Sequence, residues 1–298
     1  MLATKRVPMH MGVLLITALL SQLLNAQQKP PAKDAAAVSA EAKTSLQMAK
    51  SRLGTGWDYL VQNDVIVLFE FDVKHPDTKA KAQTNAKAAA VELLLLLARF
   101  RVDAPPPDAF PKTVPILRVF HDEAAEKAFL GAENTQKQQA RQTEQLASNE
   151  VTGRHGEVAW QWYLQQYLCE GQMPERWFRL LCTLRYSKLH AEGKQLNYDA
   201  PDLSKKSAQI ATASLDEVLT TMKSDDHLDS FVAALADLLE RGPKLLGKDF
   251  DPAWEKIVPV YLTELRIRAK DQARKVAFAE VDATKLENAV REWATKKR

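Results

Sequence analysis

The chain has 298 residues, of which 46% are hydrophobic and 27% charged, proportions that are typical of a globular protein. Its 41 Lys and Arg residues stand against 38 Asp and Glu residues, which gives a formal net charge of +3. This near balance argues against a nucleic-acid-binding protein, which would show a strong basic bias. The length is sufficient for one large domain or two small ones with a substantial core.

Residues 1–26 have the pattern of a secretory signal peptide. Lys5 and Arg6 form a basic start, Gly12 to Leu24 is apolar, and Ala26 ends a small-residue cleavage site. The apolar run is shorter than the roughly 20 residues that a spanning helix needs. We therefore expect cleavage, an extracytoplasmic location (periplasmic or secreted) and no membrane span after signal cleavage, with an uncleaved anchor as the alternative. The mature chain would carry 39 of the 41 basic residues and all 38 acidic ones.

The next segments predict a flexible leader, a hairpin and a long helix. Residues 27–53 lack a clear periodicity and are expected to be a leader, in which Ala40 to Arg52 could be helical. Trp57 to Val73 predicts a β-hairpin, because β-branched and aromatic runs flank an Asn-Asp turn. Pro76 should open a helix that continues to about Phe100, since proline is tolerated in a first turn.

A second strand and a short helix are predicted from Val114 to Phe120 and from Asp122 to Leu130. Ala132 to Asn149 is rich in Gln without an apolar stripe, so we expect a solvated helix or a mobile loop there. Glu150 to Val158 contains two glycines and could hold a short strand or a turn.

The stretch from Glu157 to Lys188 is expected to lie at the centre of the fold. It contains three of the six Trp and three of the six Tyr residues of the chain. Gly171 to Pro174 divides it into two helical patterns. Core packing is the simplest explanation for so many aromatic side chains. A polar link, His190 to Lys206, should follow it.

The remaining residues predict a helical C-terminal half. Ser214 should cap one helix, and Leu228 to Leu239 should form another that Gly242-Pro243 stops. Asp251-Pro252 should begin a helix that Pro259 kinks. The whole order predicts a helix-dominated α+β fold, with a small β-sheet packed on a long helix. Its expected divisions are a core at 54–190 and a helical region at 191–298.

The two cysteines, Cys169 and Cys182, leave a disulfide open. Export would allow the bond chemically. A tight helical hairpin would place Cys182 roughly 12 Å along the second helix from Cys169. A disulfide needs Cα atoms within about 7 Å, so two free thiols are the simpler expectation.

Val158 to Leu168, followed by Met173 to Tyr186, resembles the active-site region of gluzincin peptidases, specifically the peptidase-MA-like proteins of bacterial secreted proteomes. Their motif is an H-E-x-x-H helix with a Tyr-Leu-like end, then a Pro-x-Trp segment, then a Glu about three residues after the Trp. Here Pro174 and Trp177 stand one residue further apart than in that motif. The resemblance covers about residues 57–265 and implies a sheet, a long helix and a metal-binding helix.

The resemblance also implies that the zinc chemistry is lost. The two histidine ligand positions fall on Gln161 and Gln165, the general base on Trp162, and the third ligand on Leu180. Zinc sites use His, Cys, Asp or Glu ligands, and a neutral amide is a poor substitute for imidazole. Trp has no acid or base function. We therefore expect no catalytic residues, no metal and no cofactor at this degenerate site.

Outside the motif, a metal could be held by four residues if they converged: His155, Glu157, His190 and Glu192. The default expectation is that these His and Glu side chains are exposed in loops. We expect an exported, non-catalytic protein with a binding or structural role; its sequence does not identify a partner, and a protein or peptide ligand is the candidate. A helical interaction module without peptidase ancestry is one alternative, and it would lack a sheet packed on the long helix. A hydrolase that uses His155, Glu157 and His190 is the other.

Overall fold

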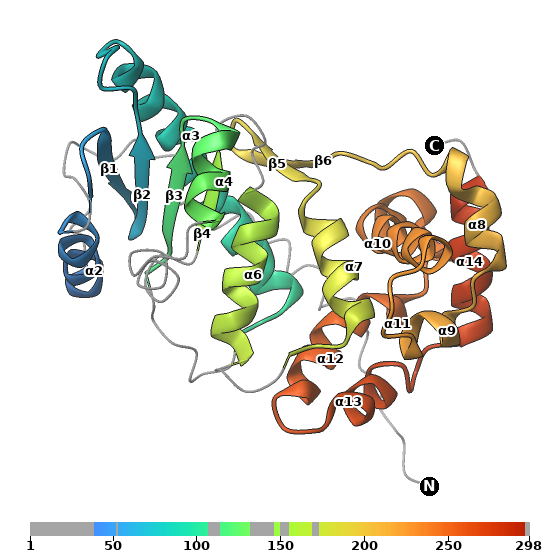
Figure 1. Ribbon diagram of the computed structural model, residues 1–298. Coiled ribbons are helices and arrows are strands. Elements are labelled where there is room, and N and C mark those ends of the chain that lie inside the picture. The colour runs from blue at the N-terminus through green and yellow to red at the C-terminus, as the bar shows by residue number, and fades with distance from the viewer. Residues whose placement is uncertain are drawn as a thin grey trace, which may run out of the picture. The chain divides into compact units, whose positions relative to one another are not determined.

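The computed structural model describes residues 39–51, 53–106, 114–131, 146–149, 155–168 and 173–295. They belong to one compact unit, which Figure 1 shows. The unit contains a four-stranded sheet, a two-stranded sheet and a helical C-terminal half. This confirms the helix-dominated α+β fold that the sequence predicts. Within the described ranges, no helix is both long enough and apolar enough to cross a membrane.

The larger sheet has the strand order β1-β2-β3-β4. β1 (Trp57–Gln62) and β2 (Val65–Glu70) form the predicted antiparallel hairpin. The turn residues Asn63 and Asp64 have φ angles of 48° and 62°, and a two-residue hairpin turn needs such a left-handed pair. β3 (Ile116–Phe120) confirms the second predicted strand and pairs with β2 in parallel.

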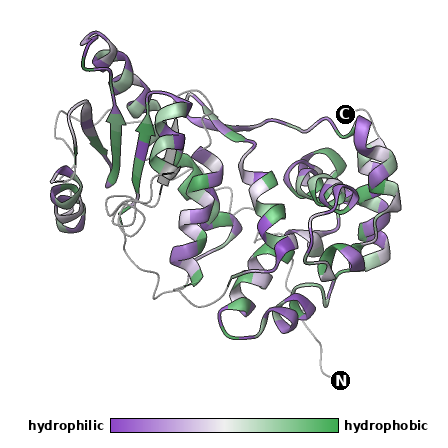
Figure 2. Cartoon of the chain, viewed as in Figure 1, coloured by the Kyte–Doolittle hydropathy of each residue, from purple (hydrophilic) through white to green (hydrophobic). Residues whose placement is uncertain are grey.

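β2 is buried on both faces of the sheet. The side chains on one face belong to the main core and pack with α3 (Thr78–Asp103), the long helix that the sequence predicts. The other face packs with Ala49 of α2 (Ala40–Lys50), a helix within the segment expected to be a leader. Figure 2 accordingly shows β2 and β3 as mostly hydrophobic. The β2 side chains toward α3 are Val65, Val67 and Phe69, and those toward α2 are Ile66 and Leu68.

The fourth strand corrects the sequence prediction. β4 (Leu146–Asn149) pairs in parallel with β3, where we expected a solvated helix or a mobile loop. The two strands pair through their backbones, so a short edge strand needs no apolar stripe of its own. The predicted short helix is present as α4 (Glu123–Gly131). Residues 132–145 and 150–154 lie outside the described part of the chain.

The two central helices are present as predicted, as α6 (His155–Leu168) and α7 (Arg176–Tyr186). They pack with α3 around a cluster of aromatic rings. Ring centroids in this cluster lie 4.4 to 5.9 Å apart, the range in which aromatic pairs attract one another. The cluster consists of Phe100, Trp160, Tyr163 and Tyr186.

A second hairpin stands where we expected a polar link. β5 (Leu189–Glu192) and β6 (Gln195–Tyr198) pair antiparallel, and Gly193 turns with a φ of 65°. The prediction of a link was wrong because these short strands are polar and carry little β-sheet signal. The hairpin also spans the expected division at residue 190.

The C-terminal half is organised around α10 (Asp226–Leu246), which packs against helices on several sides. Ser214 caps α9 as predicted, and Glu217 completes a capping box with it. The other elements of this half are η1 (Ser204–Lys206), α8 (Ser207–Thr212), α9 (Leu215–Thr220), η2 (Gly247–Asp249), α11 (Pro252–Glu255), α12 (Ile257–Leu265), α13 (Lys270–Ala277) and α14 (Ala283–Thr295).

Pro243 and Pro259, two of the prolines of this half, behave differently. Gly242-Pro243 does not stop α10, which continues to Leu246. Gly242 instead lets Phe250 pack closely, since a Cβ at that position would lie 2.7 Å from the Phe250 ring. The stop prediction was wrong: Pro243 lies in the last turn of α10, where a proline removes one helical hydrogen bond, and the extensively buried helix continues to Leu246. The kink expected from Pro259 is present as the break at Lys256, between α11 and α12.

Candidate functional site

The four positions that the resemblance to gluzincin peptidases assigns to zinc chemistry lie in different environments. Trp162 is buried in the main core, with 6% of its surface exposed. Leu180 is half-buried and packs against the same core. Gln161 and Gln165 are exposed on α6. Trp162 therefore fills space in the core, whereas the two amides face away from it.

The two exposed amides lie one turn apart on α6. Gln161 Nε2 donates to Glu157 Oε1 at 3.2 Å, which is an i, i+4 contact along the helix surface. A hydrogen bond of this kind adds only a few tenths of a kcal/mol to helix stability, roughly 0.2–0.5. Gln161 and Gln165 offer neutral amide groups to solvent, and neither is a carboxylate or imidazole ligand.

The structure does not bring the alternative metal ligands together. His155 Nδ1 lies 3.3 Å from Glu92 Oε2, and His190 Nδ1 lies 3.4 Å from Asp199 Oδ2. Glu192 accepts a hydrogen bond from Asn197. Within the described ranges, no three His, Cys, Asp or Glu side chains are grouped as a metal ion would require.

The pair of His155 and Glu92 is buried, with 12% and 14% of the two side chains exposed. The ring nitrogens of His155 and Oε1 of Glu92 have no hydrogen-bond partner in the described structure. Glu92 is not among the candidate residues that the sequence indicated. It is the single acidic residue in the apolar run from Ala88 to Ala98 of α3. This isolated charge is the signal by which the sequence could have indicated it.

Four charged side chains from three helices form what we call the ion cluster: Arg99 and Asp103 of α3, Arg185 of α7 and Glu240 of α10. Arg99 Nε donates to Asp103 Oδ1 and Oδ2 at 3.0 and 2.9 Å, and its Nη2 donates to Glu240 Oε2 at 2.9 Å. Arg185 Nε donates to the same Glu240 oxygen at 2.7 Å. The cluster joins the long helix of the sheet region to the helical half.

The ion cluster is largely shielded from solvent. The side chains of Arg185, Asp103 and Glu240 are 10%, 11% and 8% exposed. Burial alone lowers the pKa of Arg185, but the neighbouring Tyr186, Asp103 and Glu240 raise it above its ordinary value. Burial raises the pKa of Tyr186, so its hydroxyl stays protonated and donates to Asp103 Oδ2 at 3.0 Å.

Cys182 also lies on α7, and its side chain is a buried free thiol. Burial raises the pKa of this thiol well above its ordinary value, which keeps it protonated and unreactive. Cys169 lies outside the described residues. Cys182 therefore acts in the core as a small apolar side chain.

A cavity of about 390 Å³ lies against the ion cluster, and we call it the α3–α10 cavity. Its volume lies toward the lower end of the roughly 300–1,000 Å³ that small-molecule sites occupy. All four members of the ion cluster line it, together with Glu255. Its apolar lining comes from Val102, Leu239, Pro243, Trp254, Val258 and Pro259.

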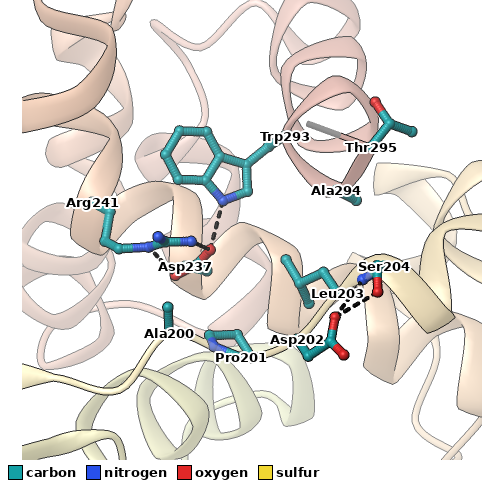
Figure 3. Close-up of a pocket in the computed structure, with 10 residues that line it drawn as sticks. All are labelled: Ala200, Pro201, Asp202, Leu203, Ser204, Asp237, Arg241, Trp293, Ala294 and Thr295. Carbon is teal, nitrogen blue, oxygen red and sulfur yellow. Dashed lines mark hydrogen bonds and ion pairs between the residues drawn. The ribbon is translucent and has the colours of Figure 1, made fainter. Parts of the chain in front are cut away.

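A second cavity, of about 350 Å³, lies between α10, α14 and the segment before η1 (Figure 3). Asp237 at this cavity is fully buried, and both of its carboxylate oxygens are used within the protein. Arg241 Nε donates to Oδ1 at 2.7 Å, and Trp293 Nε1 donates to Oδ2 at 2.7 Å. The bond from Trp293 holds α14 onto α10, and the bond from Arg241 lies within α10, so these polar groups have a structural role.

The α3–α10 cavity thus combines charge, partial enclosure and apolar surface, and neither the resemblance nor the residue spacing indicated it. Its residues come from distant parts of the sequence, with Arg99 and Glu240 separated by 141 positions. Comparisons of the chain with models of protein families, with curated proteins and with solved structures gave no match.

Proposed function

We propose that this protein is an exported, non-catalytic protein with a degenerate peptidase-MA-like fold and a binding or structural role. The observation that carries the proposal is the burial of Trp162. A general base must reach a metal-bound water, and the residue at that position is instead an indole in the core.

The chemistry of the other motif positions supports the same proposal. Gln161 and Gln165 offer neutral amides to solvent, and Leu180 offers no donor atom. A peptidase zinc site needs three protein ligands and an open position for water. With these residues, the motif lacks all three ligands and the base.

The arrangement of the sheet supports this proposal over a helical interaction module. The four-stranded sheet packs on α3, and α6 and α7 follow it in the order that the resemblance implies. The alternative of a hydrolase is less well supported, because His155 and His190 have separate acidic partners. Export rests on the pattern of residues 1–26, which lie outside the described residues.

Metal content of the purified mature protein tests the proposal. After exposure to zinc and removal of the excess, we expect elemental mass spectrometry to find far less than one zinc per chain. One tightly held zinc per chain would overturn the proposal. In that case, His155→Ala and His190→Ala would identify the ligands, with Gln165→Ala as the matched control on the exposed motif face.

A further inference from the structure

The polar atoms of the α3–α10 cavity are only partly used within the protein. Glu240 Oε2 accepts from both arginines, whereas Glu240 Oε1 accepts from no residue in the described ranges. The Nη1 atoms of Arg99 and Arg185 likewise donate to no described residue. None of the three atoms is fully enclosed, and all three belong to residues that line the cavity.

The balance of charge defines what the cavity can hold. Two guanidinium groups and two carboxylates make the ion cluster neutral, and Glu255 adds one exposed carboxylate. With Glu255 the lining carries a net charge of −1, so an anion would lie beside excess negative charge, and a simple cation would leave the two Nη1 donors unused. A ligand with one positive and one negative group can instead use the donors and the acceptor together. A planar guanidinium suits a carboxylate, and a carboxylate suits an ammonium group.

The rest of the lining defines the body of the ligand. Six apolar residues, including Trp254 and Leu239, complete the lining of the cavity. Apolar walls with a few polar groups are typical of sites for small molecules. The volume suits a molecule of the size of an amino acid or a dipeptide.

We propose that the α3–α10 cavity binds a small apolar zwitterion, a free amino acid or dipeptide in size. Its carboxylate pairs with the Nη1 donors of Arg99 and Arg185, and its ammonium group faces Glu240 Oε1 and Glu255. This goes beyond the proposed function, because it requires neither peptidase ancestry nor loss of zinc.

Titration calorimetry with L-leucine and leucyl-leucine tests the proposal. We expect one of the two to bind with a stoichiometry of one. We also expect 4-methylpentanoate, which lacks the ammonium group, and 3-methylbutylamine, which lacks the carboxylate, to bind about tenfold or more weakly, a difference of about 1.4 kcal/mol. Absence of binding by both zwitterions would overturn the proposal. Equal binding of a singly charged analogue would overturn the assignment of a zwitterion.

Two variants locate the binding in this cavity. Val102 lines the cavity and is 76% exposed, so Val102→Trp should obstruct it without disturbing the core and abolish binding. Glu255→Gln should weaken binding about threefold to tenfold by removing a charge. Ile267→Trp is the matched control, because Ile267 is 72% exposed and lies outside the cavity. Unchanged binding by Val102→Trp would overturn the site. The zinc measurement is independent, so the two proposals can fail separately.

Discussion

At the scale of single residues, Trp162 and Gln165 lie on the same helix and should respond very differently to substitution. Trp162→Ala removes a buried indole and leaves a cavity, which should lower the free energy of unfolding by about 3–5 kcal/mol. Gln165→Ala removes an exposed amide and should change it by less than about 0.5 kcal/mol. Urea denaturation measures both.

The comparison also tests the interpretation of the motif. Equal, small effects of the two substitutions would mean that Trp162 lines an open surface, in which case the proposed function would lose its main support. Gln161→Ala serves as a second exposed control, since it removes only the contact with Glu157.

His121 should make stability depend on pH. Burial lowers the pKa of His121, but the contacts with Glu70 and Asp122 outweigh it and raise that pKa above the ordinary value. His121 Nδ1 lies 2.7 Å from Glu70 Oε2, and Nε2 lies 2.8 Å from Asp122 Oδ2. A raised pKa in the folded state means that charged His121 stabilises the fold below about pH 6.5. This contribution is lost as pH rises through the folded pKa.

We therefore expect His121→Gln to lower the free energy of unfolding more at about pH 5.5 than at about pH 8.5. The difference should stay below about 1 kcal/mol, because the ring is partly exposed and solvent screens the pairs. Denaturant titrations of both proteins at the two pH values measure it. The same loss of stability at both pH values would show that folding does not raise the pKa of His121.

At the scale of elements, the start of α6 lies against the end of α7 and the start of β5. A Cβ atom added to Gly156 would lie 2.0 Å from the carbonyl oxygen of Tyr186 and 3.3 Å from that of Leu189. Both obstacles are backbone, which cannot rotate away as a flexible side chain can. Gly156→Ala should therefore lower the free energy of unfolding by about 3 kcal/mol, measured by thermal or urea denaturation.

The matched control for this contact is Gly54→Ala. Gly54 has no atom within 4 Å of an added Cβ and no positive φ, so the change should be within about 1 kcal/mol of neutral and can stabilise the fold. A neutral Gly156→Ala would contradict the close packing of α6, α7 and β5.

At the scale of the whole unit, the ion cluster connects α3, α7 and α10. Arg185→Met should lower the free energy of unfolding by about 3 kcal/mol, because it leaves the buried carboxylate of Glu240 with Arg99 as its remaining ionic partner. Lys256→Met is the control, since the Lys256–Glu280 pair is exposed and should contribute about 0–1 kcal/mol. Denaturation curves of the three proteins measure the difference. Equal losses would mean that the cluster is as solvated as a surface pair.

Sequence by itself determined the features whose causes are local. Asn63 and Asp64 tolerate left-handed backbone and so specify the first hairpin. Ser214 and Glu217 satisfy the free N–H groups at the start of α9. The apolar run of β2 requires burial on both faces of a sheet. The identities of Gln161, Trp162, Gln165 and Leu180, none of which is a usual zinc ligand or a general base, are likewise readable without a structure.

Tertiary structure alone decided the features that depend on distant partners. β4 forms because β3 offers it a backbone to pair with, and Gly242 of α10 lies against Phe250, a residue beyond the end of that helix. Arg99 and Glu240 meet only when the surfaces of α3 and α10 come together. The physical reason is the same in each case: hydrogen bonds and charges act over a few ångströms, so pairs that are far apart in the sequence interact only through the packing of the complete core.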